Sequence, residues 1–481
     1  MRDALERVSI MNEELVKSLC QYIDDHQEDI INDLIAICRI ESVTDNNAEI
    51  KPFGQSCKNV LDAMLKKGEE EGFSTHNYEY YVGSIKYDLK KEKNIGILAH
   101  LDVVPAGDDW TVTQPYEPLI KDGYLFGRGT GDDKSGAIAG LYIQKAFREL
   151  NVPLRNNIEV LLGTNEETGM KDVQYYSAHY EVPAFTFVPD AGFPGSAGEF
   201  GRLRYVLKSQ NALSPDFVDA YAGSAFNIVP NKATVVLASN TKIDYKALPE
   251  TFEVKETEKG IEITGFGVTT HAAGPERGIN AIKVLTSELL KLEGIKPDDR
   301  EILTFIDNVN QDYLGTFLGI DNQDEVSGQT VSSGTVLRFN NGYISLLNDC
   351  RYCVTDNGDR LEANIREQAA KWKFDVTVEE KTYGAHLDVN GPVIQTIKKV
   401  YEDETGNTAE IRIGKGGTYA GQMKNAFATG CHLRENWGEK PDYLPEGHGG
   451  AHQPDEFIDI KAYIKGIKLL MKMVLAVDEI L

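Results

Sequence analysis

Apolar residues in the first part of the chain follow two periods, one typical of helices and one typical of buried strands. Over residues 13–40 they recur every three or four positions, which predicts two amphipathic helices with a break near His26. The same spacing predicts helices over residues 56–72 and from Ile138 onward. Continuous apolar runs predict buried strands over residues 94–100, 158–162 and 184–188. Strands that alternate with helices indicate an α/β fold with a mostly parallel sheet.

Each of these three predicted strands ends in residues with acidic or imidazole side chains. His100 and Asp102 close the first strand, Glu166 and Glu167 follow the second, and Asp190 follows the third. The carboxyl ends of parallel strands lie along one edge of a sheet, where open α/β sheets place their ligand sites. We therefore expect the five side chains to gather there.

The pattern changes after residue 198, where short strands and hairpin-like turns replace the alternation of strands with helices. Later helices are predicted over residues 280–292, 360–372, 391–403 and 459–481. We therefore predict a discontinuous α/β domain made of residues 1–197 and 385–481, which carries the candidate site. An inserted α+β domain over residues 198–384 interrupts it.

Composition narrows the classes of partner. The chain has 481 residues, enough for two domains, and a formal net charge of −25. Such an acidic surface is repelled by nucleic acid and by anionic membranes, so we expect neither as a partner. No apolar run is long enough to span a bilayer, and residues 1–7 lack the apolar core of a signal peptide. Six sparse cysteines fit reduced thiols, and we expect a cytoplasmic protein with Cys350 and Cys353 in structural roles.

A glycine-rich stretch over residues 127–135 places Asp132 and Asp133 directly before a predicted helix. Negative charge is favoured at a helix N-terminus, so these residues could be a capping pair. They could equally be ligands, because the strand ends supply further carboxylates and His452 supplies an imidazole from the C-terminal region. Taken alone, the stretch leaves both interpretations open.

The whole set is harder to explain by capping than any one member. Two histidines with three carboxylates, one of them bridging, are what two divalent cations need for closed coordination. Residues two apart on a strand share a face, so the Asp102 carboxylate can hold the second ring nitrogen of His100. The adjacent Glu166 and Glu167 point in different directions, so one can bind metal while the other moves a proton.

Five ordered motifs carry a resemblance to a known family. They are residues 99–107 (AHLDVVPAG), 127–134 (GRGTGDDK), 165–169 (NEETG), 189–194 (PDAGFP) and 452–456 (HQPDE). The chain resembles the two-metal metallopeptidases of the aminoacylase, carboxypeptidase G and carnosinase superfamily. The likeness is strongest to PepV-type bacterial dipeptidases and extends from about residue 12 to the C-terminus.

The resemblance implies a set of metal ligands. Asp132 would bridge two divalent ions, Zn²⁺ in the first place and Mn²⁺ in the second, and the Asp132–Asp133 peptide bond would be cis. His100 and Asp190 would bind one ion. Glu167 and His452 would bind the other.

It also implies the groups that act on the substrate. Glu166 would be the general base, and Asp102 would orient His100. In the inserted domain, which would act as a lid, His271 would stabilise the oxyanion. Asn227 and Arg351 would hold the substrate backbone and carboxylate, although an ion pair within the protein is an open alternative for Arg351.

The loop with Gly416, Gly417 and Thr418 resembles the segment that cradles the same carboxylate. Two positions depart from the family pattern: Lys415 and Ser135 stand where glycine is usual. Neither change removes a ligand, but Lys415 adds a cation near an anionic substrate group. No motif assigns a role to the remaining histidines His386, His432 and His448.

The implied activity is metal-dependent hydrolysis of the peptide bond of a dipeptide or another short peptide. A deacylase or desuccinylase of N-acyl amino acids would use the same ions and stays open as an alternative. A catalytically silent metal-binding protein is a further alternative, although it would have no need of Glu166. The large insert, over residues 198–384, is long enough to cover the site without a second subunit, so we expect a monomer.

Overall fold

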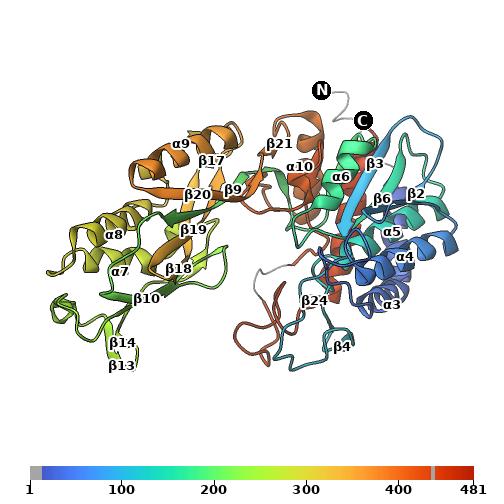
Figure 1. Ribbon diagram of the computed structural model, residues 1–481. Helices are drawn as coiled ribbons and strands as arrows, with labels where there is room; N and C mark the ends of the chain where they lie inside the picture. The colour runs from blue at the N-terminus through green and yellow to red at the C-terminus, as the bar shows by residue number, and fades with distance from the viewer. Residues whose placement is uncertain (1–12, 435–438) are drawn as a thin grey trace. The chain divides into compact units, whose positions relative to one another are not determined.

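The computed structural model describes residues 13–434 and 439–481, and the chain forms two compact units (Figure 1). Unit 1 comprises Met1–Gly198, His386–Ile413 and Gly417–Leu481. Unit 2 comprises Glu199–Ala385 and Gly414–Gly416, so this last short segment groups with the second unit although it lies far along the chain. Residues 1–7, on which the expectation of no signal peptide rests, lie outside the described residues.

A large mixed sheet forms the centre of unit 1. Its strands lie in the order β1 (Ser74–Tyr78), β2 (Val82–Tyr87), β6 (Asn157–Gly163), β3 (Asn94–His100), β7 (Phe185–Val188), β23 (Ala426–Ala428), β8 (Ser196–Glu199) and β21 (Ala385–His386), with β22 (Arg412–Gly414) also paired to β8. The inner strands β6, β3, β7 and β23 are parallel, and β1 and β2 form an antiparallel edge. The predicted α/β fold with a mostly parallel sheet at the candidate site is confirmed.

Helices surround this sheet. They are α2 (Glu13–Asp25), α3 (Gln27–Cys38), α4 (Gln55–Glu70), α5 (Lys134–Glu149), α6 (Lys171–His179), α10 (Pro392–Thr405) and α11 (Ile460–Asp478). The predicted break at His26 is confirmed, because α2 ends one residue before it and α3 begins one residue after it. A small separate sheet joins β24 (Phe457–Asp459) to β5 (Tyr124–Phe126) and β4 (Leu119–Lys121).

The inner strands are covered on both faces. Leu98 and Leu161 belong to a buried cluster with residues of α6, whereas their neighbours Ile97 and Val160 lie against α5. Side chains alternate along a strand, so continuous apolar runs are needed where both faces are covered. Close packing of α5 depends on Gly140, because a Cβ atom there would lie 2.8 Å from the Val160 side chain.

Unit 2 is an antiparallel sheet with helices packed on it. The strand order is β13 (Glu253–Thr257), β14 (Gly260–Phe266), β12 (Lys232–Leu237), β10 (Phe217–Ala222), β18 (Val331–Asn340), β19 (Tyr343–Tyr352), β9 (Gly201–Ser209) and β20 (Phe374–Thr382). Burial alternates along β9, with Leu203, Tyr205 and Leu207 in the core. Helices α7 (Ala281–Leu289), α8 (Pro297–Val309) and α9 (Gly358–Lys371) contribute buried residues to the same core.

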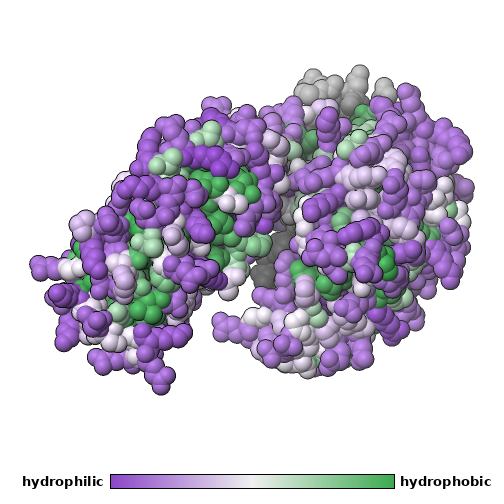
Figure 2. All heavy atoms as spheres, in the orientation of Figure 1, coloured by the Kyte–Doolittle hydropathy of each residue, from purple (hydrophilic) through white to green (hydrophobic). Residues whose placement is uncertain are grey.

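The surface of both units is mainly hydrophilic in the view of Figure 2, in keeping with a chain that is 26% charged residues. All six cysteines are free, and Cys350 and Cys353 are buried. Within residues 13–434 and 439–481, no helix has the length and apolar character required to cross a membrane.

Candidate metal centre

The parallel strands of unit 1 bring the predicted side chains to one edge of the sheet. His100 is the last residue of β3 and pairs in register with Gly163, the last residue of β6. Glu166 and Glu167 lie in the turn after β6, and Asp190 lies two residues beyond β7, on the other side of β3. The strand order therefore places His100 between the two groups of carboxylates.

Asp132 lies between the two histidines. One carboxylate oxygen, Oδ1, is 2.9 Å from Nε2 of His100, and the other, Oδ2, is 3.1 Å from Nε2 of His452. Glu167 Oε2 is 3.0 Å from the same nitrogen of His452, and Asp190 Oδ2 is 3.9 Å from Nε2 of His100. The structure thus brings these five residues together in the two groups that the resemblance implied, with Asp132 shared between them.

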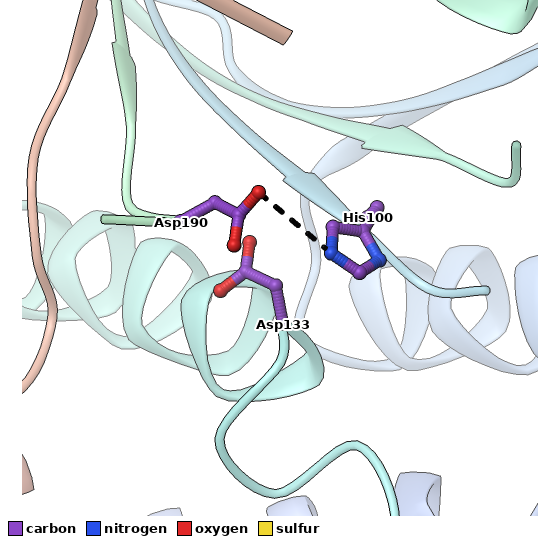
Figure 3. Close-up of side chains that lie close together, drawn as sticks. All are labelled: His100, Asp133 and Asp190. Carbon is purple, nitrogen blue, oxygen red and sulfur yellow. Dashed lines mark ion pairs between the residues drawn. The ribbon is translucent and has the colours of Figure 1, made fainter. Parts of the chain in front are cut away.

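Asp133 is a nearby carboxylate that has no part in the predicted ligand set. It occupies the N-cap position of α5, but its side chain makes no capping hydrogen bond there. Both of its carboxylate oxygens are buried without a partner in the described structure. Figure 3 shows that Asp133 and Asp190 direct their carboxylates towards each other beside the His100 ring, and the three side chains could hold a metal ion. The Asp132–Asp133 peptide bond is cis, as the resemblance implied.

Asp102 acts on its neighbours in a different way from the one predicted. The His100 ring is held through Nδ1 by the main-chain carbonyl of Asp102, 2.8 Å away, whereas the nearer carboxylate oxygen is 3.7 Å from that nitrogen. The carboxylate instead accepts hydrogen bonds from the backbone N–H groups of Glu166 and Glu167, at 3.0 and 3.1 Å. Backbone N–H groups need hydrogen-bond acceptors, and Asp102 supplies them for the turn that carries both glutamates.

Burial, hydrogen bonds and neighbouring charges shift the pKa values of the side chains in the site. Burial raises the pKa of Glu166 well above its ordinary value, and the nearby charges of Glu167 and Asp132 raise it further while His100 opposes the shift. Hydrogen bonds to Asp132 and Glu167 raise the pKa of His452 to about 10. Burial raises the pKa of Asp133 to about 8, and Asp132 adds to that effect.

These features fit divalent cations. Carboxylate oxygens and imidazole nitrogens are the ligand types of Zn²⁺ and, with more oxygen, of Mn²⁺. Asp133 offers two buried oxygens without a partner, and Asp132 shares its carboxylate between two histidines, so both present oxygen atoms that a cation could bind. The donor set therefore suits the two ions that the resemblance implied.

In unit 2, the pairing of β11 (Ile228–Val229) with β15 (Thr270–His271) brings the predicted catalytic residue His271 close to the predicted substrate-binding residue Asn227. His271 pairs in register with Ile228, and the backbone carbonyl of Asn227 accepts a hydrogen bond of 2.8 Å from Ala272. The N–H of Ala273 donates to Nδ1 of His271 at 3.0 Å. The neutral ring therefore carries its proton on Nε2 and presents a donor there.

Arg351 forms the ion pair that the sequence left open as an alternative. Its guanidinium is 3% exposed and donates to both carboxylate oxygens of Asp349, at 2.5 and 3.0 Å. A third donor reaches the carbonyl of Lys415 at 3.0 Å. Arg351 thus ties the Gly414–Gly416 segment to β19, and one N–H on each terminal nitrogen stays outside these bonds.

The predicted carboxylate-binding loop divides between the units. Gly416 groups with unit 2, whereas Gly417 and Thr418 belong to unit 1. Thr418 caps the short helix η4 (Tyr419–Gly421) by accepting a hydrogen bond from Ala420. Tyr419, the next residue, lies edge-on to the His100 ring, with 6.3 Å between the ring centroids.

Several residues of the site were missed by the sequence analysis. The Tyr419 hydroxyl donates to Asp172, whose carboxylate also accepts hydrogen bonds from the N–H groups of Thr164 and Asn165. Tyr419 and Asp172 are 247 positions apart, and no local pattern links them. Glu456 lay inside a recognised motif, and its position four residues after His452 was the only signal for a role.

Comparisons with known proteins agree with this geometry. The model of Peptidase family M20/M25/M40 matches residues 96–476. The YtjP protein of Bacillus subtilis (strain 168) is 31% identical over 460 residues, which cover 92% of this chain and 96% of that protein. The Beta-Ala-Xaa dipeptidase of Lactobacillus delbrueckii subsp. lactis is also 31% identical, over 84% of this chain and 88% of its own length.

Among solved structures, human carnosine dipeptidase 1 superposes with a TM-score of 0.58 at 15% sequence identity. The match covers 96% of this chain and 99% of the human one, so the two share a fold across their length. The family match spans most of the chain, including every strand end that contributes to the candidate centre. The chain belongs to Peptidase family M20/M25/M40.

Proposed function

We propose that the protein is a metal-dependent dipeptidase that hydrolyses the peptide bond of dipeptides or other short peptides. The observation that carries this proposal is the position of Asp132, whose two carboxylate oxygens each lie within about hydrogen-bond distance of a different histidine. A carboxylate shared in this way is suited to bridge two cations. Membership of the peptidase family supports the same reaction.

Six side chains would hold the two ions. His100 and Asp190 would serve one ion, His452 and Glu167 the other, and Asp132 both; Asp133 is close enough to contribute on the side of His100. The ions, Zn²⁺ or Mn²⁺, would supply Lewis-acid activation of water and of the scissile carbonyl. Asp102 would keep the glutamate turn and the His100 ring in place through the hydrogen bonds described above.

Glu166 is the proposed general base. It neighbours the ligand Glu167 in the same turn and belongs to neither histidine pair, so it is available to accept a proton from the attacking water. Burial raises its pKa, which makes the carboxylate a better proton acceptor than an exposed glutamate. The same carboxyl then donates that proton to the leaving amine.

The proposed role of unit 2 is that of a lid that binds the substrate. His271 presents Nε2–H, and a neutral donor of this kind can stabilise an oxyanion as the carbonyl is attacked. Burial and the charge of Arg351 lower the pKa of His271, which favours the neutral form. Asn227 directly precedes β11, which pairs with β15, and its proposed role is to hold the substrate backbone.

The relatives support a substrate class. Two of them have names that specify dipeptidase activity, one on Beta-Ala-Xaa dipeptides and one on carnosine. We therefore place dipeptides with a free amino end first, and N-acyl amino acids, the substrates of a deacylase, second. We also propose that the protein acts in the cytoplasm and as a monomer.

A metal-reconstitution assay tests the function. The protein is stripped of metal with a chelator, given Zn²⁺ or Mn²⁺, and assayed on Ala-Ala, β-Ala-Xaa dipeptides, and N-acetyl and N-succinyl amino acids. We expect hydrolysis of the dipeptides only, restored by added metal. Hydrolysis of the acyl compounds alone would establish the deacylase, and no hydrolysis with either ion would favour the silent metal-binding protein.

A further inference from the structure

We propose that Glu456 is a positioning residue for Asp132 and acts through the backbone of the glycine-rich turn. The inference rests on the proposed function, since it concerns the carboxylate that is to bridge the two ions. Glu456 itself touches neither histidine and belongs to no proposed ligand set. Its role is to set where the bridging carboxylate lies.

The Glu456 carboxylate accepts hydrogen bonds from several backbone N–H groups of the glycine-rich turn. Its Oε1 atom accepts hydrogen bonds from the backbone N–H groups of Gly129 at 3.1 Å, Gly131 at 2.9 Å and Asp132 at 3.1 Å. Three donors on one oxygen hold the turn at three points, the last of them at the bridging residue. An unpaired buried N–H is costly, so these contacts strongly favour one conformation of the turn.

A buried arginine compensates the charge of Glu456. The other carboxylate oxygen, Oε2, accepts a hydrogen bond of 2.6 Å from Arg128, and each side chain is 1% exposed. Arg128 also donates to the carbonyl of Ala106 at 3.2 Å. A buried charge without its partner is costly. The Glu456 carboxylate is therefore held next to the Arg128 guanidinium.

The backbone around Glu456 is fixed to the same turn. Strand β24 follows Glu456 directly and pairs with β5, with Phe457 opposite Phe126. The carbonyl of Glu456 then accepts a hydrogen bond of 2.9 Å from Gly127. Side chain and main chain therefore hold the turn together, and both reach it from the C-terminal segment.

The same C-terminal segment carries His452. The hydrogen bonds of Glu456 therefore link the backbone segments that carry two of the proposed ligands, His452 and Asp132. His452 has φ of +63° and Asp455 has φ of +54°, conformations that non-glycine residues adopt only when their surroundings enforce them. Asp455 is held by the N–H groups of Thr111 and Val112, at 2.9 and 2.8 Å. Glu456 thus connects the segment that presents His452 to the turn that presents Asp132.

The test measures metal affinity in the intact protein. Metal-free wild type, Glu456→Ala and Glu456→Gln are titrated with Zn²⁺ by calorimetry, and thermal unfolding of each metal-free protein is recorded. Partners that orient metal ligands are worth about 10- to 100-fold in affinity, so we expect a loss in that range for Glu456→Ala. Glu456→Gln keeps an acceptor oxygen for the turn but not the charge, and we expect a smaller loss.

Asp478→Ala is the matched control. Asp478 is also a buried carboxylate that accepts two backbone N–H groups, from Arg155 at 2.8 Å and Asn156 at 2.9 Å, next to the amino end of β6. We expect Asp478→Ala to lower the unfolding midpoint and to bind Zn²⁺ as wild type does.

The outcomes separate the two proposals. Wild type that binds Zn²⁺ together with Glu456 variants of unchanged affinity would overturn the positioning role and leave the proposed function intact. Equal losses of affinity in the Glu456 variants and in Asp478→Ala would also overturn it, because the effect would then be general destabilisation. Wild type that binds neither Zn²⁺ nor, in a parallel titration, Mn²⁺ would overturn both proposals. If Glu456→Ala does not fold, Glu456→Gln decides the question.

Discussion

Glu166 and Glu167 are adjacent in sequence but have different surroundings. Glu167 lies 3.0 Å from His452, whereas Glu166 belongs to neither histidine pair. We predict that Glu166→Gln lowers kcat by about 10²- to 10⁴-fold, the usual contribution of general acid–base catalysis, and leaves the bound metal content unchanged. Steady-state kinetics with elemental analysis of the purified variant would measure both quantities.

The neighbouring substitution Glu167→Gln provides the control for this prediction. It changes the same chemical group one position along, and we expect loss of metal from the protein together with loss of activity. Normal turnover by Glu166→Gln would show that another residue is the base. Loss of metal from Glu166→Gln would show that the two glutamates share the ligand role.

His271 gives a prediction about pH. Burial and the positive charges of Arg351 and Arg202 lower its pKa from the ordinary value of 6.5, while Asp349 opposes the shift. A lowered pKa means that the folded ring binds its proton only at more acidic pH than the unfolded ring does. We therefore expect its NMR titration midpoint below 6.5, with the neutral ring protonated on Nε2.

Two charge-removing variants test the cause of that shift. Arg202→Gln removes a cation, so it should move the His271 midpoint upward. Asp349→Asn removes an anion and should move it downward. A wild-type midpoint at or above 6.5 would contradict the predicted shift, and a neutral ring protonated on Nδ1 would contradict the proposed donor role.

Sequence reasoning at this scale identified ligand types but not every contact. Spacing alone could not separate capping from ligation for Asp132, because both need a carboxylate before a helix. The resemblance separated them, and the contacts with His100 and His452 agree with it. The main-chain contact between Asp102 and His100 could not be predicted, because the Asp102 carboxylate is directed to the N–H groups of the glutamate turn, whose position only the fold determines.

Among the elements, those with a strong apolar period were predicted well. The runs that predicted strands correspond to β3, β6 and β7, and the predicted helix from Ile138 lies within α5. Helix α6 was missed because its nine residues bury only Asp172, Val173 and Tyr176, too few to give a periodic signal. Its packing is instead fixed by a cluster that includes residues far along the chain, such as Met423.

Gly140 permits the close packing of α5 on the sheet. A Cβ atom there would lie 2.8 Å from Cγ2 of Val160 and 3.2 Å from Cγ2 of Ile97. Alanine is the better helix former, but crowding of a packed core costs about 1–3 kcal/mol. We therefore predict that Gly140→Ala lowers the free energy of unfolding, as measured by urea denaturation.

A double variant tests whether crowding is the cause. Val160→Ala removes the atom that a new Cβ would meet, so Gly140→Ala should cost less in the Val160→Ala background than in wild type. Equal costs in the two backgrounds would contradict the packing explanation. A gain in stability from Gly140→Ala alone would show that helix propensity exceeds the crowding.

At the scale of the whole molecule, the change to short strands and hairpin-like turns after residue 198 is the basis for predicting an inserted domain over residues 198–384. The grouping of Gly414–Gly416 with unit 2 was beyond sequence reasoning, because it depends on contacts between distant positions. The carbonyl of Gly414 accepts a hydrogen bond from Phe200, and that of Lys415 accepts one from Arg351. The ammonium of Lys415 also lies 5.2 Å from the centre of the Phe200 ring.

The division into units predicts where metal stabilises the molecule. All proposed ligands belong to unit 1, and a ligand stabilises only the structure that it binds, by about 2.7 kcal/mol at a concentration of 100 Kd. We expect added Zn²⁺ to slow hydrogen exchange in the strand ends and turns of unit 1, including residues 127–135 and 164–170. The core strands β18 and β19 of unit 2 should exchange at the same rate with and without Zn²⁺.

Exchange measured by mass spectrometry would test this, with Asp132→Ala as the control that should lose the effect in unit 1. Equal protection of both units from exchange would contradict this prediction. It would show that the two units unfold as one cooperative structure, because unit 2 contributes no metal ligand of its own.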